Sequence, residues 1–83
     1  MEAFVFVNCL LTMTGVVENA ARATQGVLAA YPTTGIYDLV LKVTAPDEIK
    51  LEDVVKRVKG IQGVAATMTS IIYKMGHPNR LLA

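Results

Sequence analysis

The residues best placed to do chemistry in this chain are an aspartate beside a glycine turn and a short group of hydroxyls. Asp38 follows the turn 33–35 at the start of an apolar stretch, where a carboxylate must be solvated, paired or available to a ligand. A strand-end aspartate that bonds turn amides is the structural alternative. Thr67, Thr69 and Ser70 pose a similar choice, because hydroxyls can bind a ligand or simply favour extended backbone. The residues alone leave both alternatives open.

Conventional catalytic and metal-binding patterns are absent from the sequence. It has no cysteine pair, no histidine pair and no glycine-rich phosphate loop, and its only histidine, His77, stands near the C-terminus. Cys9 lies in an apolar run, where a buried, inert thiol is expected. Glu48, Glu52 and Asp53 are typical of the solvated face of a helix. We therefore expect no enzyme activity, no bound metal and no cofactor.

An internal repeat indicates which elements position these residues. A Gln-Gly-Val triplet at 25–27 returns at 62–64, and the two glycines stand 37 positions apart. Each triplet follows a helical stretch, so each half of the chain reads as strand, helix, strand. Two such units in one small chain predict the α+β, ferredoxin-like βαββαβ fold, with an antiparallel four-stranded sheet of order 4-1-3-2 and two helices on one face.

Periodicity and breaker residues place the individual elements. Strands are predicted at 2–11, 27–33, 36–44 and 64–75, and helices from 14 to 25 and from 48 to 60. Thr14 and Asp47 are the expected N-caps, and Pro32, which lacks a backbone N–H, places the second strand at an edge. Strict alternation puts Tyr37 on the same face as Leu39. We expect residues 1–75 to form one domain and 76–83 a C-terminal tail.

The first strand is apolar on both faces, which has a consequence for assembly. The two helices can cover only one face of the sheet, so the other face needs a different partner. The chain is also 53% apolar with a mean hydropathy of +0.45, which is rich for 83 residues that leave much of their surface in water. We therefore predict a dimer formed through the sheet. The predicted interface residues are Phe4, Phe6, Leu10 and Val40.

Charge and hydropathy exclude two classes of partner. Eight Lys and Arg residues balance seven Asp and Glu residues, and the basic ones are dispersed along the chain. Such a distribution disfavours direct binding to nucleic acid. No apolar run reaches the ~20 residues that span a bilayer, and the N-terminus lacks the pattern of a secretion signal. We expect a cytoplasmic protein without membrane contact.

The segments 25–27, 31–43, 62–64 and 67–70 resemble the effector domain of the Lrp/AsnC feast/famine regulators. That module is also called the RAM domain, for regulation of amino-acid metabolism. The Thr-Gly-Ile-Tyr-Asp turn at 34–38, followed by an apolar strand, is the most specific part of a resemblance that covers residues 2–75. Full-length regulators carry a helix-turn-helix domain first, whereas this sequence begins at the first strand. It therefore resembles the stand-alone version of the module.

The resemblance implies a function and a place for it. Family members dimerise through their sheets and assemble into rings of dimers, with amino acids bound between neighbouring dimers. A bound amino acid needs an acceptor for its ammonium and donors for its carboxylate, which an acid, turn amides and hydroxyls supply. The implied partners are an amino acid, further copies of the chain and full-length Lrp/AsnC regulators that it modulates. The implied ligand-binding residues are Thr34, Gly35, Asp38, Thr67, Thr69 and Ser70.

Two other functions are compatible with the same fold. A small dimeric α/β-barrel enzyme of the oxygenase or isomerase type shares the strand order and dimerises, but it needs a polar catalytic group inside the barrel. An ACT-like allosteric module overlaps in fold and in ligand class, and it differs in how its dimer packs. The amino-acid-binding regulatory module is the function that we expect.

Overall fold

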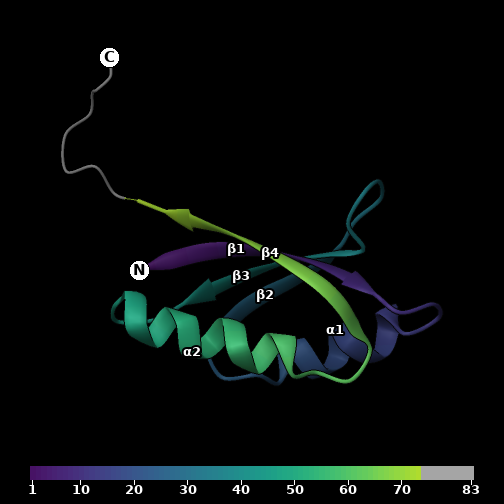
Figure 1. Cartoon of the computed structure of the whole chain (residues 1–83), viewed down its shortest axis with the longest axis horizontal. Helices are drawn as coiled ribbons and strands as arrows, with labels where there is room; N and C mark the ends of the chain where they lie inside the picture. The colour runs from purple at the N-terminus through teal and green to yellow at the C-terminus, as the bar shows by residue number, and fades with distance from the viewer. Residues whose placement is uncertain (74–83) are drawn as a thin grey trace, which may run out of the picture.

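The computed structural model describes residues 1–73 of the chain. The elements are β1 (Glu2–Cys9), α1 (Thr14–Arg22), β2 (Val27–Pro32), β3 (Leu39–Thr44), α2 (Glu48–Lys59) and β4 (Val64–Ile72). The strands form one antiparallel sheet in the order β2-β3-β1-β4, and both helices lie on the same side of it (Figure 1). The predicted ferredoxin-like fold is confirmed, as is the edge position of the second strand.

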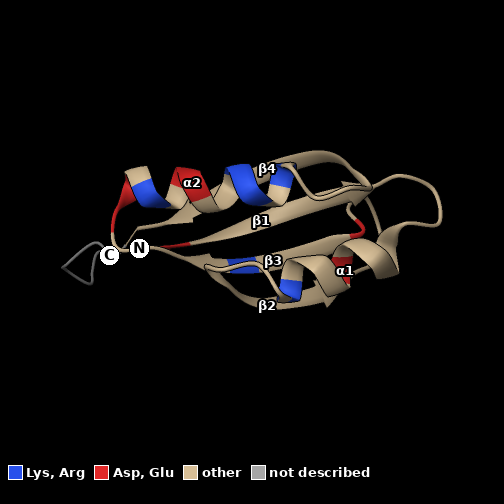
Figure 2. Cartoon of the chain, turned by 90° about the horizontal axis from the view of Figure 1, so that it is seen from below, with Lys and Arg blue, Asp and Glu red and all other residues tan. Residues whose placement is uncertain are grey.

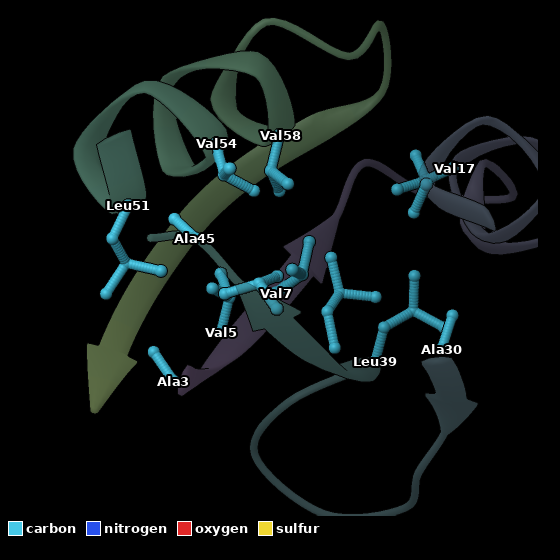
Figure 3. Close-up of a cluster of buried hydrophobic side chains, with 13 residues drawn as sticks. Ala3, Val5, Val7, Val17, Ala30, Leu39, Ala45, Leu51, Val54 and Val58 are labelled. Atoms are coloured by element: carbon cyan, nitrogen blue, oxygen red, sulfur yellow. The ribbon is translucent and has the colours of Figure 1, made fainter. Parts of the chain in front are cut away.

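The core lies between the sheet and the two helices and consists of apolar side chains. Figure 3 shows Leu51 and Val58 of α2 on the side of β1, whereas Val17 of α1 lies toward Leu39 and Ala30. Within residues 1–73 no polar or charged residue is buried, so every polar side chain lies at least partly at the surface. The largest fully buried side chains are Leu39, Leu41, Leu51, Val5, Val7, Val17, Val43 and Val58.

The two helices begin in different ways. Asp47 is the N-cap of α2, as predicted, and its Oδ1 accepts a hydrogen bond from the Lys50 amide at 2.8 Å. The prediction for α1 was wrong, because Thr14 is the first helical residue and Met13 holds the cap position without a side-chain hydrogen bond. Neither helix in the described part of the chain is long and apolar enough to cross a membrane.

The strands differ from the prediction at their ends. β1 ends at Cys9, and β3 begins at Leu39 instead of residue 36, because 33–38 form a hairpin loop. Tyr37 therefore lies outside the ladder, where alternation does not apply. Its ring contacts Phe6, on the face opposite Leu39, so the predicted placement of Tyr37 was wrong. β4 is described to Ile72, and the predicted tail lies outside the described residues.

The sequence repeat appears in the structure as a reciprocal contact between the halves. Gly26 follows α1 with φ +96°, and a Cβ placed there would lie 2.5 Å from Cγ2 of Val54 in α2. Gly63 follows α2 with φ +102°, and a Cβ there would lie 2.9 Å from Cγ2 of Val17 in α1. Val17 and Val54 have the same spacing in the sequence as the two glycines. Each helix thus packs a valine against the glycine that follows the other helix.

Candidate functional site

The hairpin between β2 and β3 has a hydrogen-bonded base and a solvent-exposed tip. At the base, the Thr33 amide donates to the Asp38 carbonyl at 2.9 Å, and the Thr33 hydroxyl donates to the Tyr37 carbonyl at 2.7 Å. Thr34 and Gly35 form the exposed tip, and Gly35 has φ +101° with no atom within 4 Å of the place where a Cβ would stand. The tip is therefore held in place by its base and offers its backbone to another molecule.

Asp38 connects this hairpin to the end of β1. Its Oδ2 accepts a hydrogen bond from the Cys9 amide at 2.7 Å, and its own amide donates to the Val7 carbonyl at 2.9 Å. The side chain is half-buried, and its Oδ1 has no hydrogen bond within residues 1–73. Asp38 therefore has a structural role at a strand end and still presents one carboxylate oxygen. Its partner is a distant strand amide, not an amide of its own turn.

The three predicted hydroxyl residues lie on both faces of β4. Thr67 is paired with Val7 and Thr69 with Val5, whose side chains are buried under the helices, so both threonines point to the helix side. Ser70 points to the opposite side. Within one chain the predicted ligand residues therefore do not meet in a single cavity. Asp38 and Thr67 lie at the same end of the sheet, on either side of β1.

A groove lies between α2 and the helix-facing side of β4, and we call it the α2–β4 groove. It has a volume of about 350 Å³ and is lined by Thr69, Ile71 and side chains of α2 from Glu48 to Lys59. Leu51 and Val55 form part of its apolar floor. Of the predicted ligand residues, Thr69 is the one that this groove contains.

The sheet face opposite the helices, here the open face, has no layer covering it within the described residues (Figure 1). The ring centroids of Phe6 and Tyr37 lie 5.3 Å apart, and the Tyr37 hydroxyl donates to Sδ of Met68 at 3.4 Å. Tyr37 and Met68 were missed as members of this face, because only the strand register places Met68 opposite Phe6. Leu10 follows β1 and is 56% exposed. The predicted interface residues on the open face are Phe4, Phe6 and Val40.

Cys9 and the acidic residues show no arrangement for nucleophilic or metal chemistry. Burial raises the pKa of the Cys9 thiol, the charge of Asp38 adds to the rise, and a hydrogen bond with Thr14 opposes it. The thiol is therefore protonated at neutral pH and is a poor nucleophile. Among residues 1–73, no three His, Cys, Asp or Glu side chains could together hold a metal ion. His77 lies outside the described residues.

The fold and these surfaces define a small ferredoxin-like module with an uncovered sheet face whose centre is apolar, and with an exposed polar hairpin. Residues 2–81 match the family model described as the Lrp/AsnC ligand binding domain. The chain belongs to the Lrp/AsnC ligand-binding domain family. The resemblance found in the sequence is thereby confirmed.

Three comparisons illustrate where this module occurs. A solved protein of Thermus thermophilus has 28% identity and a TM-score of 0.83, covering 94% of this chain and 98% of that one. The feast or famine regulatory protein of M. tuberculosis, solved with L-methionine, shares the fold at 23% identity and TM-score 0.74, covering 95% and 54%. Homocitrate synthase of Sulfurisphaera tokodaii is 29% identical over 75 residues, which are 89% of this chain. The chain spans only 16% of that relative's length.

Proposed function

We propose that this chain is a non-enzymatic regulatory module that binds an amino acid between copies of itself. The observation that carries the proposal is the match to a ligand-binding domain family over residues 2–81. The M. tuberculosis regulator with the same fold holds L-methionine, which supports an amino acid as the class of ligand. The module acts through assembly with itself and with full-length Lrp/AsnC regulators in the cytoplasm, and it does not contact DNA or a membrane.

Self-assembly through the open face follows from its composition. Aromatic and thioether side chains in its centre lose water contact when a second copy packs against them, and burial of apolar area stabilises the dimer by about 25 cal/mol per Å². Phe6, Tyr37 and Met68 form such a centre. A two-fold contact of this kind uses the same patch on both copies. The same composition argues against the barrel enzyme, because this face would line the barrel interior and its centre is apolar.

The ligand site is completed by a neighbouring copy. The hairpin tip at Thr34 and Gly35 is exposed, and Oδ1 of Asp38 is free to accept from an ammonium group. The opposite wall consists of Thr67 and Thr69 on the helix side of β4 and Ser70 on the other side of the same strand, and it is displaced from the hairpin within one chain. We therefore assign that wall to a neighbouring dimer. Such a site forms only in the assembled protein, so ligand and assembly stabilise each other.

Calorimetric titration of the twenty amino acids into wild type and two Asp38 variants tests the site. Asp38→Ala removes the charge-assisted hydrogen bond to the ammonium and should weaken binding by roughly 10- to 150-fold. Asp38→Asn keeps an oxygen that can accept from the Cys9 amide but removes the negative charge. It should therefore keep the wild-type melting temperature while losing affinity.

Two outcomes would contradict this assignment. If wild type binds no amino acid at millimolar concentration, the sensing function is wrong for this chain. If Asp38→Asn binds as tightly as wild type while Asp38→Ala only melts earlier, Asp38 is structural and the ligand lies elsewhere.

A second candidate partner is an enzyme. The similarity to homocitrate synthase of Sulfurisphaera tokodaii, at 29% identity, is comparable to the similarity to the Thermus protein at 28%. We infer from this similarity that a module of this kind can also work together with a catalytic chain. Size-exclusion chromatography of the purified chain with a full-length Lrp/AsnC regulator, and separately with a homocitrate synthase, decides between the partners. Co-elution with the synthase alone would favour the enzyme.

A further inference from the structure

The two edges of the sheet are protected to different degrees, and β2 is the protected one. It is short, ends at Pro32 and has an irregular register between Val27 and Ala29. The Arg22 guanidinium also donates to the Ala30 carbonyl oxygen at 2.6 Å. Short length, proline, an irregularity and a cationic side chain are the features that keep an edge strand from pairing with another chain.

β4, at the other edge, carries only one of these features, a register irregularity at its first residues, between Val64 and Ala66. Its nine residues include no proline, no glycine and no charged side chain, as the all-tan strand in Figure 2 shows. Within residues 1–73, β1 is the only strand that pairs with β4, so its outer backbone N–H and C=O groups have no strand partner. From Ala66 to Ile72 the pairing with β1 is regular, and a long, uncharged edge of this kind is a template for a further strand.

The flank of this edge is α2, whose charges are divided by sign. Glu48 and Glu52 line the first part of the α2–β4 groove, and Lys56 and Lys59 line the last part. Glu52 and Lys56 have the spacing of an intrahelical ion pair, yet none joins them in the described part of the chain. Four charged side chains therefore stand free beside an unpaired strand edge.

We propose that this edge pairs with the same edge of a second copy across a two-fold axis. The two β4 strands then run antiparallel and join two sheets into one, and the two α2 helices lie side by side in opposite directions. In that arrangement Glu48 faces the partner's Lys59, and Glu52 faces the partner's Lys56. We call the row formed by Glu48, Glu52, Lys56 and Lys59 the charged stripe. When two copies of α2 run in opposite directions, the acidic half of one stripe faces the basic half of the other. If the two helices ran in the same direction, like charges would face each other.

Backbone hydrogen bonds and the apolar groove floor supply the affinity, and the charges select the partner. Exposed ion pairs contribute only about 0.2–1 kcal/mol each, so four of them alone would not hold two chains together. Like charges in the same places oppose association, which makes the stripe a device for orientation and specificity. The occupant that best fits both the strand edge and the stripe is therefore another copy of this chain.

This edge interface is separate from the open face of the proposed function. It uses neither Phe6 nor the hairpin that carries Asp38, although its strand also carries Thr67, Thr69 and Ser70 of the proposed ligand wall. Two different two-fold interfaces on one chain link dimers into larger assemblies, which close into a ring or extend as a filament according to the angle between the axes. Failure of amino-acid binding would leave the edge interface untouched, so the two proposals are tested separately.

Charge exchange tests the edge interface by sedimentation velocity. In a Phe6→Asp background, which blocks the open face, the remaining dimer should be the edge dimer. Glu48→Lys/Glu52→Lys makes the stripe wholly basic, and Lys56→Glu/Lys59→Glu makes it wholly acidic. Each variant alone should associate about 10- to 100-fold more weakly, because like charges then face each other. An equimolar mixture of the two should restore the dimer.

Lys50→Glu/Arg57→Glu is the matched control. It changes the charge by as much as the acidic variant, but on the other flank of α2, where both side chains line a different hollow. It should leave the dimer intact. The proposal is overturned if all variants sediment alike, if the control dissociates as much as the acidic variant, or if the mixture of folded variants stays monomeric. The same variants without Phe6→Asp should reduce a larger assembly to the open-face dimer.

Discussion

At the scale of single residues, Gly26 is the position where one added methyl group should do most damage. It combines φ +96° with a position at which an added Cβ would lie 2.5 Å from Cγ2 of Val54. Gly26→Ala must therefore strain the backbone and displace a core side chain, and we expect a loss of about 2–4 kcal/mol in the free energy of unfolding. Urea denaturation measures it.

Two other glycines separate the causes of that loss. Gly35 has φ +101° but nothing within 4 Å of an added Cβ, so Gly35→Ala should lose only the backbone term, about 1–2 kcal/mol. Gly15 lies in α1 with open space around it, and Gly15→Ala should gain about 0.5–1 kcal/mol from helix propensity. If Gly26→Ala is no worse than Gly35→Ala, the contact with Val54 is not the cause.

The candidate site could be predicted only in part at this scale. The sequence identified Asp38 as an unusual acid, but its partner, the Cys9 amide, is 29 residues away and only the fold brings them together. Tyr37 was assigned to the wrong face because the hairpin ends the strand alternation before it. Residue types therefore indicate which side chains are unusual for their position, whereas the strand register determines which residues those side chains contact.

At the scale of elements, Asp47 is the side chain that fixes the start of α2. Asp47→Ala removes the hydrogen bond to the Lys50 amide and should lower the free energy of unfolding by about 1 kcal/mol. Asp47→Asn retains an accepting oxygen and should lose much less. Chemical denaturation of the three proteins checks both values.

The matched control for that prediction is the other helix. Thr14 makes no cap in α1, so Thr14→Ala should change the free energy of unfolding by less than Asp47→Ala. Equal losses at the two positions would mean that the cap bond is not what stabilises α2. Thr14 and Asp47 both have side chains that favour the cap position, so residue type alone could not predict that only Asp47 forms a cap.

At the scale of the whole molecule, the open face predicts that the protein is not a stable monomer. Phe6 lies at its centre against Tyr37. Phe6→Asp would bury an unpaired carboxylate in the interface at a cost of several kcal/mol, so the open-face contact should dissociate. Light scattering at micromolar concentration measures the change in mass.

Val16→Asp is the control for this prediction. Val16 is also an exposed apolar residue, but it lies on α1, away from the open face. It should leave the mass unchanged. A wild-type monomer, or equal loss of mass in both variants, would contradict assembly through the open face.

The overall topology was predictable because it depends on patterns that the sequence carries locally. The repeated Gln-Gly-Val triplet and the apolar periodicity between its copies are enough to order the strands, and Pro32 agrees with an edge position. The α2–β4 groove and the free edge of β4 were not predictable in this way. They depend on which strand stays unpaired on one side and on how a helix lies beside it, which no local pattern states.

The reciprocal contacts of Gly26 with Val54 and of Gly63 with Val17 have a consequence for the origin of the fold. Since each half supplies the valine that covers the other half's glycine, two identical half-length chains related by a two-fold axis would satisfy both contacts. The equal spacing of the glycines and valines is what a duplication and fusion of such an ancestor would leave behind. This arrangement also constrains later substitutions, because a larger residue at either glycine would displace a core valine in the other half of the chain.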